Sequence, residues 1–395
     1  MSYMKRNKIV IITTGWFPEG DAGAVRLQMM GRALTEIGYK VTVLCRGKLN
    51  DKGQYFSVEY CSYRNKQSGL FSKIIDFIEF PSKVKKYLNN NNEELYAVYI
   101  YNAHDSLFTY CKSFCHKHSI KLIHDCVEWY SPEEYTLGRF DIWYRKKNRI
   151  NTKIIDKSFS IIAITKYLEE YFSSKGINTI RVPILCDTET GITPKPLNEN
   201  DVTTIFYGGL PGTKDLVGNL LEASLMLTED EKKKLKIIIV GATKDYLVRV
   251  SHIRSDVIDR CLDYTVLHGR LQRKQVLEIM SESDFSFLAR DRELRYAKAG
   301  FPSKVVEALS NATPMICNIS SDLEEYLVDG KNAILAEDHT PSALCNALRR
   351  AINLSSLDKQ SLSINALETA KNKFDYRIYK DKIRDFVDSS GEAKL

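Results

Sequence analysis

The chain has 395 residues, more than one ordinary hydrophobic core accommodates, so its length predicts two domains. Hydrophobic residues make up 44% and charged residues 27%, a composition that excludes a disordered or fibrous protein. The formal net charge of +7 comes from the first half, because residues 1–200 hold 29 basic against 21 acidic residues and residues 201–395 hold 28 against 29.

The amino-terminal residues lead directly into a short apolar run. Residues 1–8 carry no signal-peptide pattern, and no apolar run in the chain reaches the roughly 18 residues that span a bilayer. Nine cysteines without a repeated spacing do not form a disulfide framework. We therefore expect a cytoplasmic protein.

Short β-branched, apolar runs alternate with amphipathic helical patterns along the first half of the chain. The runs are apolar on both faces, as buried parallel strands require. The predicted strands are 8–14, 40–45, 96–101, 121–125 and 159–165, and the predicted helices include 24–37 and 166–174.

Two stretches of this half mix basic residues with large apolar ones. They are Phe71–Leu88 and Phe140–Ile154. A basic amphipathic helix can lie on an anionic membrane surface, but an ordinary helix with one face in the core has the same pattern. Both interpretations stay open for these stretches. Nucleic acid is not expected as a partner, because no nucleic-acid-binding motif accompanies the charge.

A third stretch of the first half resembles a metal site. Cys111, Cys115 and His118 could share one helix face beside His116. Zinc motifs usually bring ligands from two separate elements, so we expect a helix with two half-buried thiols and no metal.

The second half repeats the alternation, after a polar segment with two prolines at 187–201. The predicted strands are 203–207, 236–240, 265–267, 284–288, 314–317 and 333–335. Alternating strands and helices indicate parallel sheets with right-handed crossovers. The predicted fold class is therefore α/β, with two Rossmann-like doubly wound domains facing a central cleft at the carboxyl ends of their strands.

Glycine-rich turns follow the first strand of each predicted domain. The first turn includes Gly20 and Gly23 and runs into a helix, so backbone can approach a ligand at the positive helix end. It lacks the G-x-G-x-x-G pattern of a dinucleotide-binding dehydrogenase. The second turn carries Gly209 and places Lys214 at the start of the next helix. Such a turn suits a diphosphate, although a tight turn with a solvated lysine has the same sequence.

The segment around residue 300 is the most informative part of the sequence. Pro302 is a natural first helical residue, which leaves the N–H groups of Ser303 and Lys304 free to bind an anion. Arg290, at the end of the preceding strand, can reach the same place with two donors. Glu307 lies one turn beyond Lys304 and could accept from a ribose diol or form a surface pair with Lys304.

Taken together, these motifs resemble family 4 of the retaining glycosyltransferases, which have the GT-B fold. The resemblance also includes His124-Asp125, His268-Gly269-Arg270 and the run Gly300-Phe-Pro-Ser-Lys-Val-Val-Glu-Ala-Leu. It implies that Lys214 binds the donor diphosphate, that Glu307 holds the ribose and that His124 contacts the donor sugar. It also implies that Gly269 and Arg270 lie at the nucleotide base.

Two positions depart from the family pattern. Gly209 stands where the family usually has an arginine, so Arg290 and Lys304 would supply the missing charge. Ala299 replaces the first acid of the E-x7-E motif, which normally binds donor-sugar hydroxyls. A polysaccharide-assembly subset of the family is similar in having Gly-Phe-Pro-Ser-Lys here.

The resemblance implies an acceptor-binding domain at 1–186, a linker at 187–201, a nucleotide-sugar-binding domain at 202–373 and a terminal helix at 374–395 that crosses back to the first domain. The expected reaction moves a sugar, with retention, from a UDP- or GDP-linked donor to a glycan or lipid-linked acceptor of bacterial surface polysaccharide. His124, Arg290 and Lys214 are the expected catalytic residues, with no cofactor and no metal.

Two other functions stay open at this point. A non-hydrolysing sugar-nucleotide epimerase can use the same architecture and would need no acceptor. A non-catalytic nucleotide-sugar-binding protein would bind donor without releasing nucleoside diphosphate. Resemblance at the level of the fold does not separate them.

Overall fold

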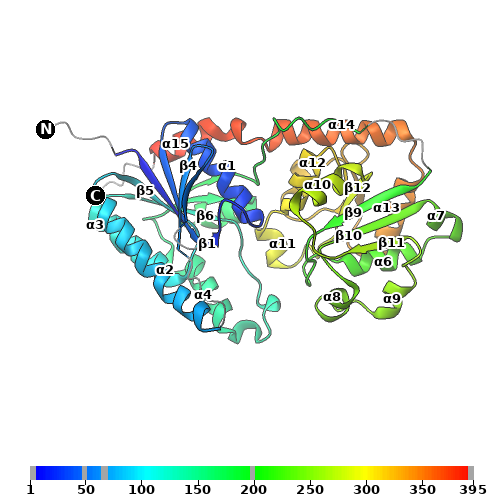
Figure 1. Ribbon diagram of the computed structural model, residues 1–395, viewed down its shortest axis with the longest axis horizontal. Coiled ribbons are helices and arrows are strands. Elements are labelled where there is room, and N and C mark those ends of the chain that lie inside the picture. The colour runs from blue at the N-terminus through cyan, green and yellow to red at the C-terminus, as the bar shows by residue number, and fades with distance from the viewer. Residues whose placement is uncertain (1–5, 47–50, 64–69, 196–200, 390–395) are drawn as a thin grey trace. The chain divides into compact units, whose positions relative to one another are not determined.

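The structure is a computed structural model that describes residues 6–46, 51–63, 70–195 and 201–389, apart from the side chains of 70–78. The chain forms two compact units. Unit 1 comprises Met1–Leu185, Ala299–Phe301 and Tyr376–Leu395, and unit 2 comprises Cys186–Lys298 and Pro302–Asp375. Each unit contains one sheet with helices around it, which confirms the predicted α/β fold class (Figure 1).

The sheet of unit 1 has the strand order β3-β4-β2-β1-β5-β6-β7-β8. All neighbours are parallel except β3 and β4, which form an antiparallel edge. The strands are β1 (Lys8–Trp16), β2 (Lys40–Arg46), β3 (Lys52–Tyr55), β4 (Val58–Ser62), β5 (Leu95–Asn102), β6 (Lys121–Cys126), β7 (Ser160–Ala163) and β8 (Asn178–Arg181).

Helices connect these strands. They are α1 (Ala22–Glu36), α2 (Leu70–Asn91), α3 (Asp105–His118), α4 (Ile142–Arg149) and α5 (Lys166–Ser173), with short helical turns η1 (Pro132–Glu134), η2 (Gly138–Phe140) and η3 (Ile150–Ile154). Helix α1 begins where Asp21 accepts a hydrogen bond from the N–H of Gly23, as a helix-capping aspartate does.

The end of the chain returns to unit 1, as expected. The turn η5 (Tyr376–Tyr379) and helix α15 (Lys380–Ser389) belong to this unit, and Figure 1 shows α15 beside α1. Ile383, Phe386 and Val387 of α15 are buried in the same core as Leu27 of α1. This burial of apolar side chains holds the terminal helix on unit 1.

The sheet of unit 2 is parallel, with the order β11-β10-β9-β12-β13-β14. Its strands are β9 (Thr203–Gly208), β10 (Leu235–Val240), β11 (Thr265–His268), β12 (Phe285–Leu288), β13 (Met315–Asn318) and β14 (Ala333–Ala336). The helices that follow are α6 (Val217–Leu225), α7 (Glu229–Lys233), α8 (Lys244–Arg249), α9 (Ser255–Asp259), α10 (Arg273–Glu282), α11 (Arg295–Ala299), α12 (Ser303–Ser310), η4 (Leu323–Glu325), α13 (Pro341–Ile352) and α14 (Ser356–Lys373).

Three strands of unit 1 were not expected from the sequence. Strands β3 and β4 form a short hairpin of mixed polar and apolar residues, and β8 is a polar edge strand. None of them has the continuous apolar run that identified the buried strands. Within the described residues, no helix combines the length and hydropathy that a membrane span requires.

Candidate active site

A buried carboxylate, Asp215, lies at the carboxyl end of the unit 2 sheet and holds two cations. The Nε of Arg290 is 2.9 Å from Asp215 Oδ1, and the Nζ of Lys304 is 2.8 Å from Asp215 Oδ2. The hydroxyl of Tyr207 also donates to Oδ2, at 2.9 Å. Burial by itself would raise the pKa of Asp215, but Arg290 and Lys304 lower it to about 2. The carboxylate is therefore charged at neutral pH and fixes both cations.

The structure thus brings Arg290 and Lys304 together, although the sequence analysis did not identify Asp215. The only signal for it is an acid directly after Lys214 in the glycine-rich turn. Nothing local distinguishes that acid from a solvated one, because its two cationic partners come from segments 75 and 89 residues away.

Arg290 is held by its backbone as well as by its side chain. Its N–H donates to Oδ1 of Asn318 at 3.0 Å, and Nδ2 of Asn318 donates to its carbonyl oxygen at 2.9 Å. Asn318 is the last residue of β13, and Arg290 lies two residues beyond the end of β12. These bonds fix the Arg290 backbone at the edge of the sheet where ligands of such folds bind, and Asp215 holds its guanidinium there.

The end of the Lys304 side chain lies beside Gly209. The φ of Gly209 is +126°, and a Cβ at this position would lie 2.9 Å from Cε of Lys304. A side chain at residue 209 would therefore require the end of Lys304 to shift. The lysine occupies the space beside Gly209, where the resemblance places an arginine.

Lys214 is not at a helix start, contrary to the expectation. Helix α6 begins at Val217, and Lys214 lies in the preceding turn. Its Nζ is 5.3 Å from the ring centroid of Tyr296, whose hydroxyl donates to the Lys214 carbonyl at 3.1 Å. Pro302 also differs from the expectation by one position. It is the N-cap of α12 rather than its first residue, because the helix begins at Ser303.

Glu307 forms an ion pair with Arg273 of α10, at 2.8 Å between Oε1 and Nη2. The alternative of a surface pair with Lys304 is wrong, because Lys304 contacts Asp215. The Glu307 side chain is 29% exposed, so it is accessible to a ligand. Ser303 and Lys304 are the first two residues of α12, where backbone N–H groups have no acceptor inside the helix.

Three strand ends meet around Gly209. The N–H of Gly209 donates to the carbonyl of Val240 at 2.8 Å, and the N–H of Gly241 donates to the carbonyls of His268 and Gly269, each at 3.1 Å. A Cβ at Gly241 would lie 2.7 Å from the carbonyl oxygen of Gly209. Gly269 therefore lies next to this edge, and Arg270, which follows it, is exposed.

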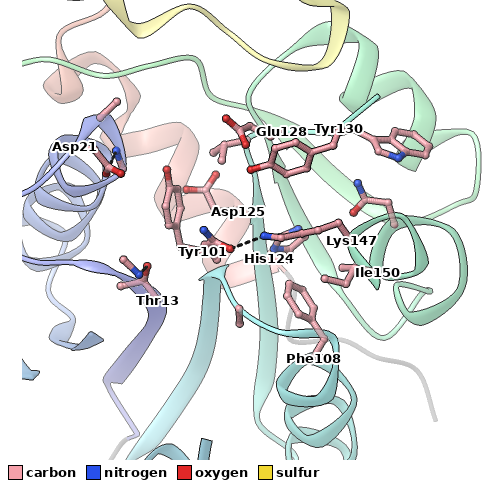
Figure 2. A pocket seen from close by; sticks show the side chains of 18 of the residues that line it. Thr13, Asp21, Tyr101, Phe108, His124, Asp125, Glu128, Tyr130, Lys147 and Ile150 are labelled. Carbon is pink, nitrogen blue, oxygen red and sulfur yellow. Dashed lines mark hydrogen bonds between the residues drawn. The ribbon is translucent and has the colours of Figure 1, made fainter. Parts of the chain in front are cut away.

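His124 lines a cavity of about 310 Å³ within unit 1. Figure 2 shows the side chains of Tyr101, His124, Glu128 and Lys147 around this space. The Nδ1 of His124 lies 2.9 Å from the carbonyl oxygen of Ile100, so Nδ1 must be the donor and Nε2 an acceptor. Burial lowers the pKa of His124 to about 4, which keeps the ring neutral at pH 7.

The charges at this cavity come from several elements. The Nζ of Lys147, on α4, donates to Oδ1 of Asn102 at 3.0 Å and lies 5.5 Å from the ring centroid of Tyr130. Burial lowers the pKa of Lys147.

Of the two expected loop glycines, Gly23 lines the cavity and lies in the first turn of α1, whereas Gly20 is not among the lining residues.

Asp125, next to His124, belongs to a buried ion pair. Nε and Nη2 of Arg26 each lie 2.7 Å from an Asp125 oxygen, and the hydroxyl of Tyr99 donates to Oδ2 at 2.6 Å. Arg26 also donates to the carbonyls of Pro183 and Val182. These contacts tie α1, β5, β6 and the segment after β8 together, so Asp125 has a structural role.

The cysteine and histidine stretch of α3 does not form a metal site. Cys111 and Cys115 are buried in the core of unit 1 rather than half-buried, and His116 is exposed. Among the residues that the structure describes, no group of three metal-ligating side chains is found.

Comparisons with known proteins give a family match for part of the chain and a fold for nearly all of it. Residues 187–368 match the family model described as glycosyl transferases group 1. An uncharacterized glycosyltransferase of Methanocaldococcus jannaschii, MJ1069, is 23% identical over 237 residues, which are 58% of each chain. The match thus spans less than two thirds of that relative.

Solved structures match over nearly the whole chain. They include sucrose-phosphate synthase from Thermosynechococcus elongatus (TM-score 0.75, 14% identity, 97% of this chain and 99% of that one). Anabaena HepE in complex with UDP-glucose has a TM-score of 0.68 at 14% identity, over 97% and 99%. WaaG, a glycosyltransferase involved in lipopolysaccharide biosynthesis, has a TM-score of 0.66 at 15% identity, over 96% and 99%. At these identities the likeness establishes the fold.

Proposed function

We propose that this chain, whose residues 187–368 match the family model of glycosyl transferases group 1 and which has a GT-B fold, is a glycosyltransferase. It transfers a sugar from a nucleoside-diphosphate sugar to a glycan or lipid-linked acceptor. The observation that carries this proposal is the convergence of Arg290 and Lys304 beside Gly209 at the strand ends of unit 2.

The donor diphosphate is proposed to bind at these cations. Arg290 and Lys304 bring two positive charges and Asp215 one negative charge, so the cluster has one positive charge in excess. Lys214 and the first N–H groups of α12 add to the attraction for an anion. As the bond to the sugar breaks, negative charge grows on the leaving phosphate, and fixed cations stabilise that charge.

The nucleoside is proposed to lie between Glu307 and the turn at Gly269 and Arg270. A carboxylate accepts from both hydroxyls of a ribose, and Glu307 would exchange its pair with Arg273 for these bonds. Because HepE has been solved with UDP-glucose, we propose a uridine nucleotide first and a guanosine nucleotide second. Ala299 is buried and apolar, so the donor sugar meets no carboxylate at that position.

The acceptor is proposed to enter the unit 1 cavity, whose volume lies at the lower end of the range for small-molecule sites. A neutral His124 is proposed to contact the transferred sugar, and transfer is proposed to occur with retention and without a metal. We place the reaction in the cytoplasm, at the membrane, in the assembly of a bacterial surface polysaccharide.

A thermal-shift series tests the donor site first. We expect UDP or GDP, and the matching nucleotide sugars, to raise the melting temperature, because a ligand at 100 times its Kd adds about 2.7 kcal/mol. Lys304→Ala should remove this shift. Lys233→Ala, which alters an exposed lysine of the same unit, should keep it. Stabilisation by no nucleotide would contradict the proposal.

Turnover then separates transfer from the other functions. A transferase releases nucleoside diphosphate in proportion to glycosylated acceptor. An epimerase interconverts the donor sugar with no acceptor present, and a binding protein releases no nucleoside diphosphate with any acceptor. Chromatography of the donor and product pools distinguishes the three outcomes.

A further inference from the structure

Four large apolar side chains are exposed within seven residues of unit 1. Leu137, Phe140, Ile142 and Trp143 are 65%, 86%, 63% and 51% exposed. Leu137 directly precedes η2, Phe140 is its last residue, and Ile142 and Trp143 begin α4. Single exposed apolar residues are normal on a protein surface, but a contiguous group of large ones marks an interaction surface.

A different face of helix α4 packs into the core of unit 1. Tyr144 is buried in unit 1, as is Ile150 directly after the helix. The exposed residues are therefore additional to the face that anchors the helix. We call Leu137, Phe140, Ile142 and Trp143, with the basic residues among them, the α4 surface.

Basic side chains accompany the apolar ones. Arg139 and Arg145 are exposed, and Nζ of Lys146 lies 5.3 Å from the ring centroid of Trp143. The acid in this stretch, Asp141, caps α4 by accepting from the N–H groups of Trp143 and Tyr144. Interleaved aromatic, aliphatic and basic side chains fit the boundary between anionic headgroups and acyl chains.

The other basic stretch of unit 1 does not have this character in its described part. Phe80, Val84 and Leu88 of α2 are fully buried, so the core accounts for their apolar pattern. Its first half, including Lys73, Ile74, Ile75, Phe77 and Ile78, lies outside the residues whose side chains are described.

We infer that the α4 surface binds an anionic membrane, with Phe140, Ile142 and Trp143 entering the headgroup region and Arg139, Arg145 and Lys146 contacting lipid phosphates. The inference rests on the proposed function and deepens it, because α4 also carries Lys147, which lines the acceptor cavity. A lipid-borne acceptor held at the outer side of this helix is thereby presented beside that cavity.

Vesicle sedimentation of the full chain tests the inference. We expect binding to phosphatidylcholine vesicles that contain phosphatidylglycerol, weaker binding at high salt, and little binding to phosphatidylcholine alone. The double variant Arg145→Gln, Lys146→Gln should bind roughly 25-fold more weakly, since each base near the surface contributes about 1 kcal/mol. Phe140→Ser, Trp143→Ser should lose about tenfold or more. Leu357→Ser, at a side chain that is 67% exposed in unit 2, is the matched control and should bind normally.

Tryptophan fluorescence reports insertion directly. Vesicles should shift the emission of the native protein to shorter wavelength, brominated acyl chains should quench it, and Trp143→Phe should abolish both effects. Loss of binding in the basic variant but not in the apolar variant would mean simple electrostatic adsorption and would overturn the inference. So would a dimer that Phe140→Ser, Trp143→Ser converts to monomers, because the surface would then be an interface between copies. Nucleotide binding without vesicles does not involve these residues, so it tests the proposed function separately.

Discussion

The ammonium of Lys304 lies 2.8 Å from the buried carboxylate of Asp215, in the space that a side chain at residue 209 would fill. The pair thus places a cation beside Gly209 and an anion that holds it there. Asp215 touches Arg290 by its other oxygen, so its charge determines the position of both cations.

Asp215→Asn should therefore destabilise the protein in a pH-dependent way. The folded-state pKa of about 2 is below the ordinary value of 3.8, so the stabilisation is complete above pH 4 and is lost as the pH falls through 2. The shift corresponds to about 2 kcal/mol at pH 7. Urea unfolding should show this loss at pH 7 and a smaller one near pH 3. Asp230→Asn, in an exposed pair with Lys233, should change stability little; equal effects of both variants would refute the role of Asp215.

Gly209→Ala should disturb Lys304, whereas Gly212→Ala should not. Both glycines have positive φ, +126° and +55°, but a Cβ at Gly212 meets nothing within 4 Å. We expect each variant to lose stability by about 1–3 kcal/mol from backbone strain. The donor KM should rise in Gly209→Ala alone, measured by steady-state kinetics. A similar rise in both would mean that the contact between Gly209 and Lys304 has no part in donor binding.

Arg290→Ala and Glu307→Ala should differ in their kinetics. The ribose bonds of Glu307 are similar in the ground and transition states, so its loss should mainly raise the donor KM. Phosphate charge grows in the transition state, so loss of Arg290 should lower kcat by roughly 10- to 1000-fold. Arg292→Ala, at an exposed arginine two residues along, is the control. If Arg290→Ala keeps its kcat while Glu307→Ala loses it, the diphosphate lies elsewhere.

His124 should stay neutral throughout the physiological pH range. Its folded-state pKa of about 4 is below the ordinary 6.5, so the unfolded chain takes up the proton first. Stability should be complete above pH 6.5 and fall by on the order of 3 kcal/mol as the pH drops to 4. His124→Asn should remove that part of the acid sensitivity, whereas His116→Asn, at an exposed position, should keep it. Titration of the His124 ring signal between pH 6 and 7 by NMR would contradict this prediction.

Donor turnover should survive EDTA. In the proposed site, Lys214, Arg290 and Lys304 neutralise the diphosphate, which is the task of a bound cation in metal-dependent transferases. Initial rates with and without the chelator, measured on freshly purified protein, check this. Complete loss of turnover that magnesium or manganese restores would show that the protein cations are insufficient.

The buried strands and the α/β class could be predicted because the central parallel strands are apolar on both faces, a local property of the sequence. Strands β3, β4 and β8 lack that signature, because they mix polar and apolar residues at or next to the two edges of the unit 1 sheet. Arg290 and Lys304 were found for a similar reason, because strand ends and helix starts are visible locally. Their ligand roles stay predictions.

The sequence by itself determined where the buried strands of both units lie, and that Arg290 and Lys304 stand at a strand end and a helix start of unit 2. Only the tertiary structure decided their partners. Arg26 pairs with Asp125, 99 residues away, and Lys304 pairs with Asp215, 89 residues away. A buried charge requires an opposite charge nearby, but spacing along the chain does not reveal which residue supplies it. Likewise, Phe140 and Phe80 both lie in stretches that mix basic and apolar residues. Phe140 is exposed, whereas Phe80 is buried. The difference depends on which helix face the rest of unit 1 covers.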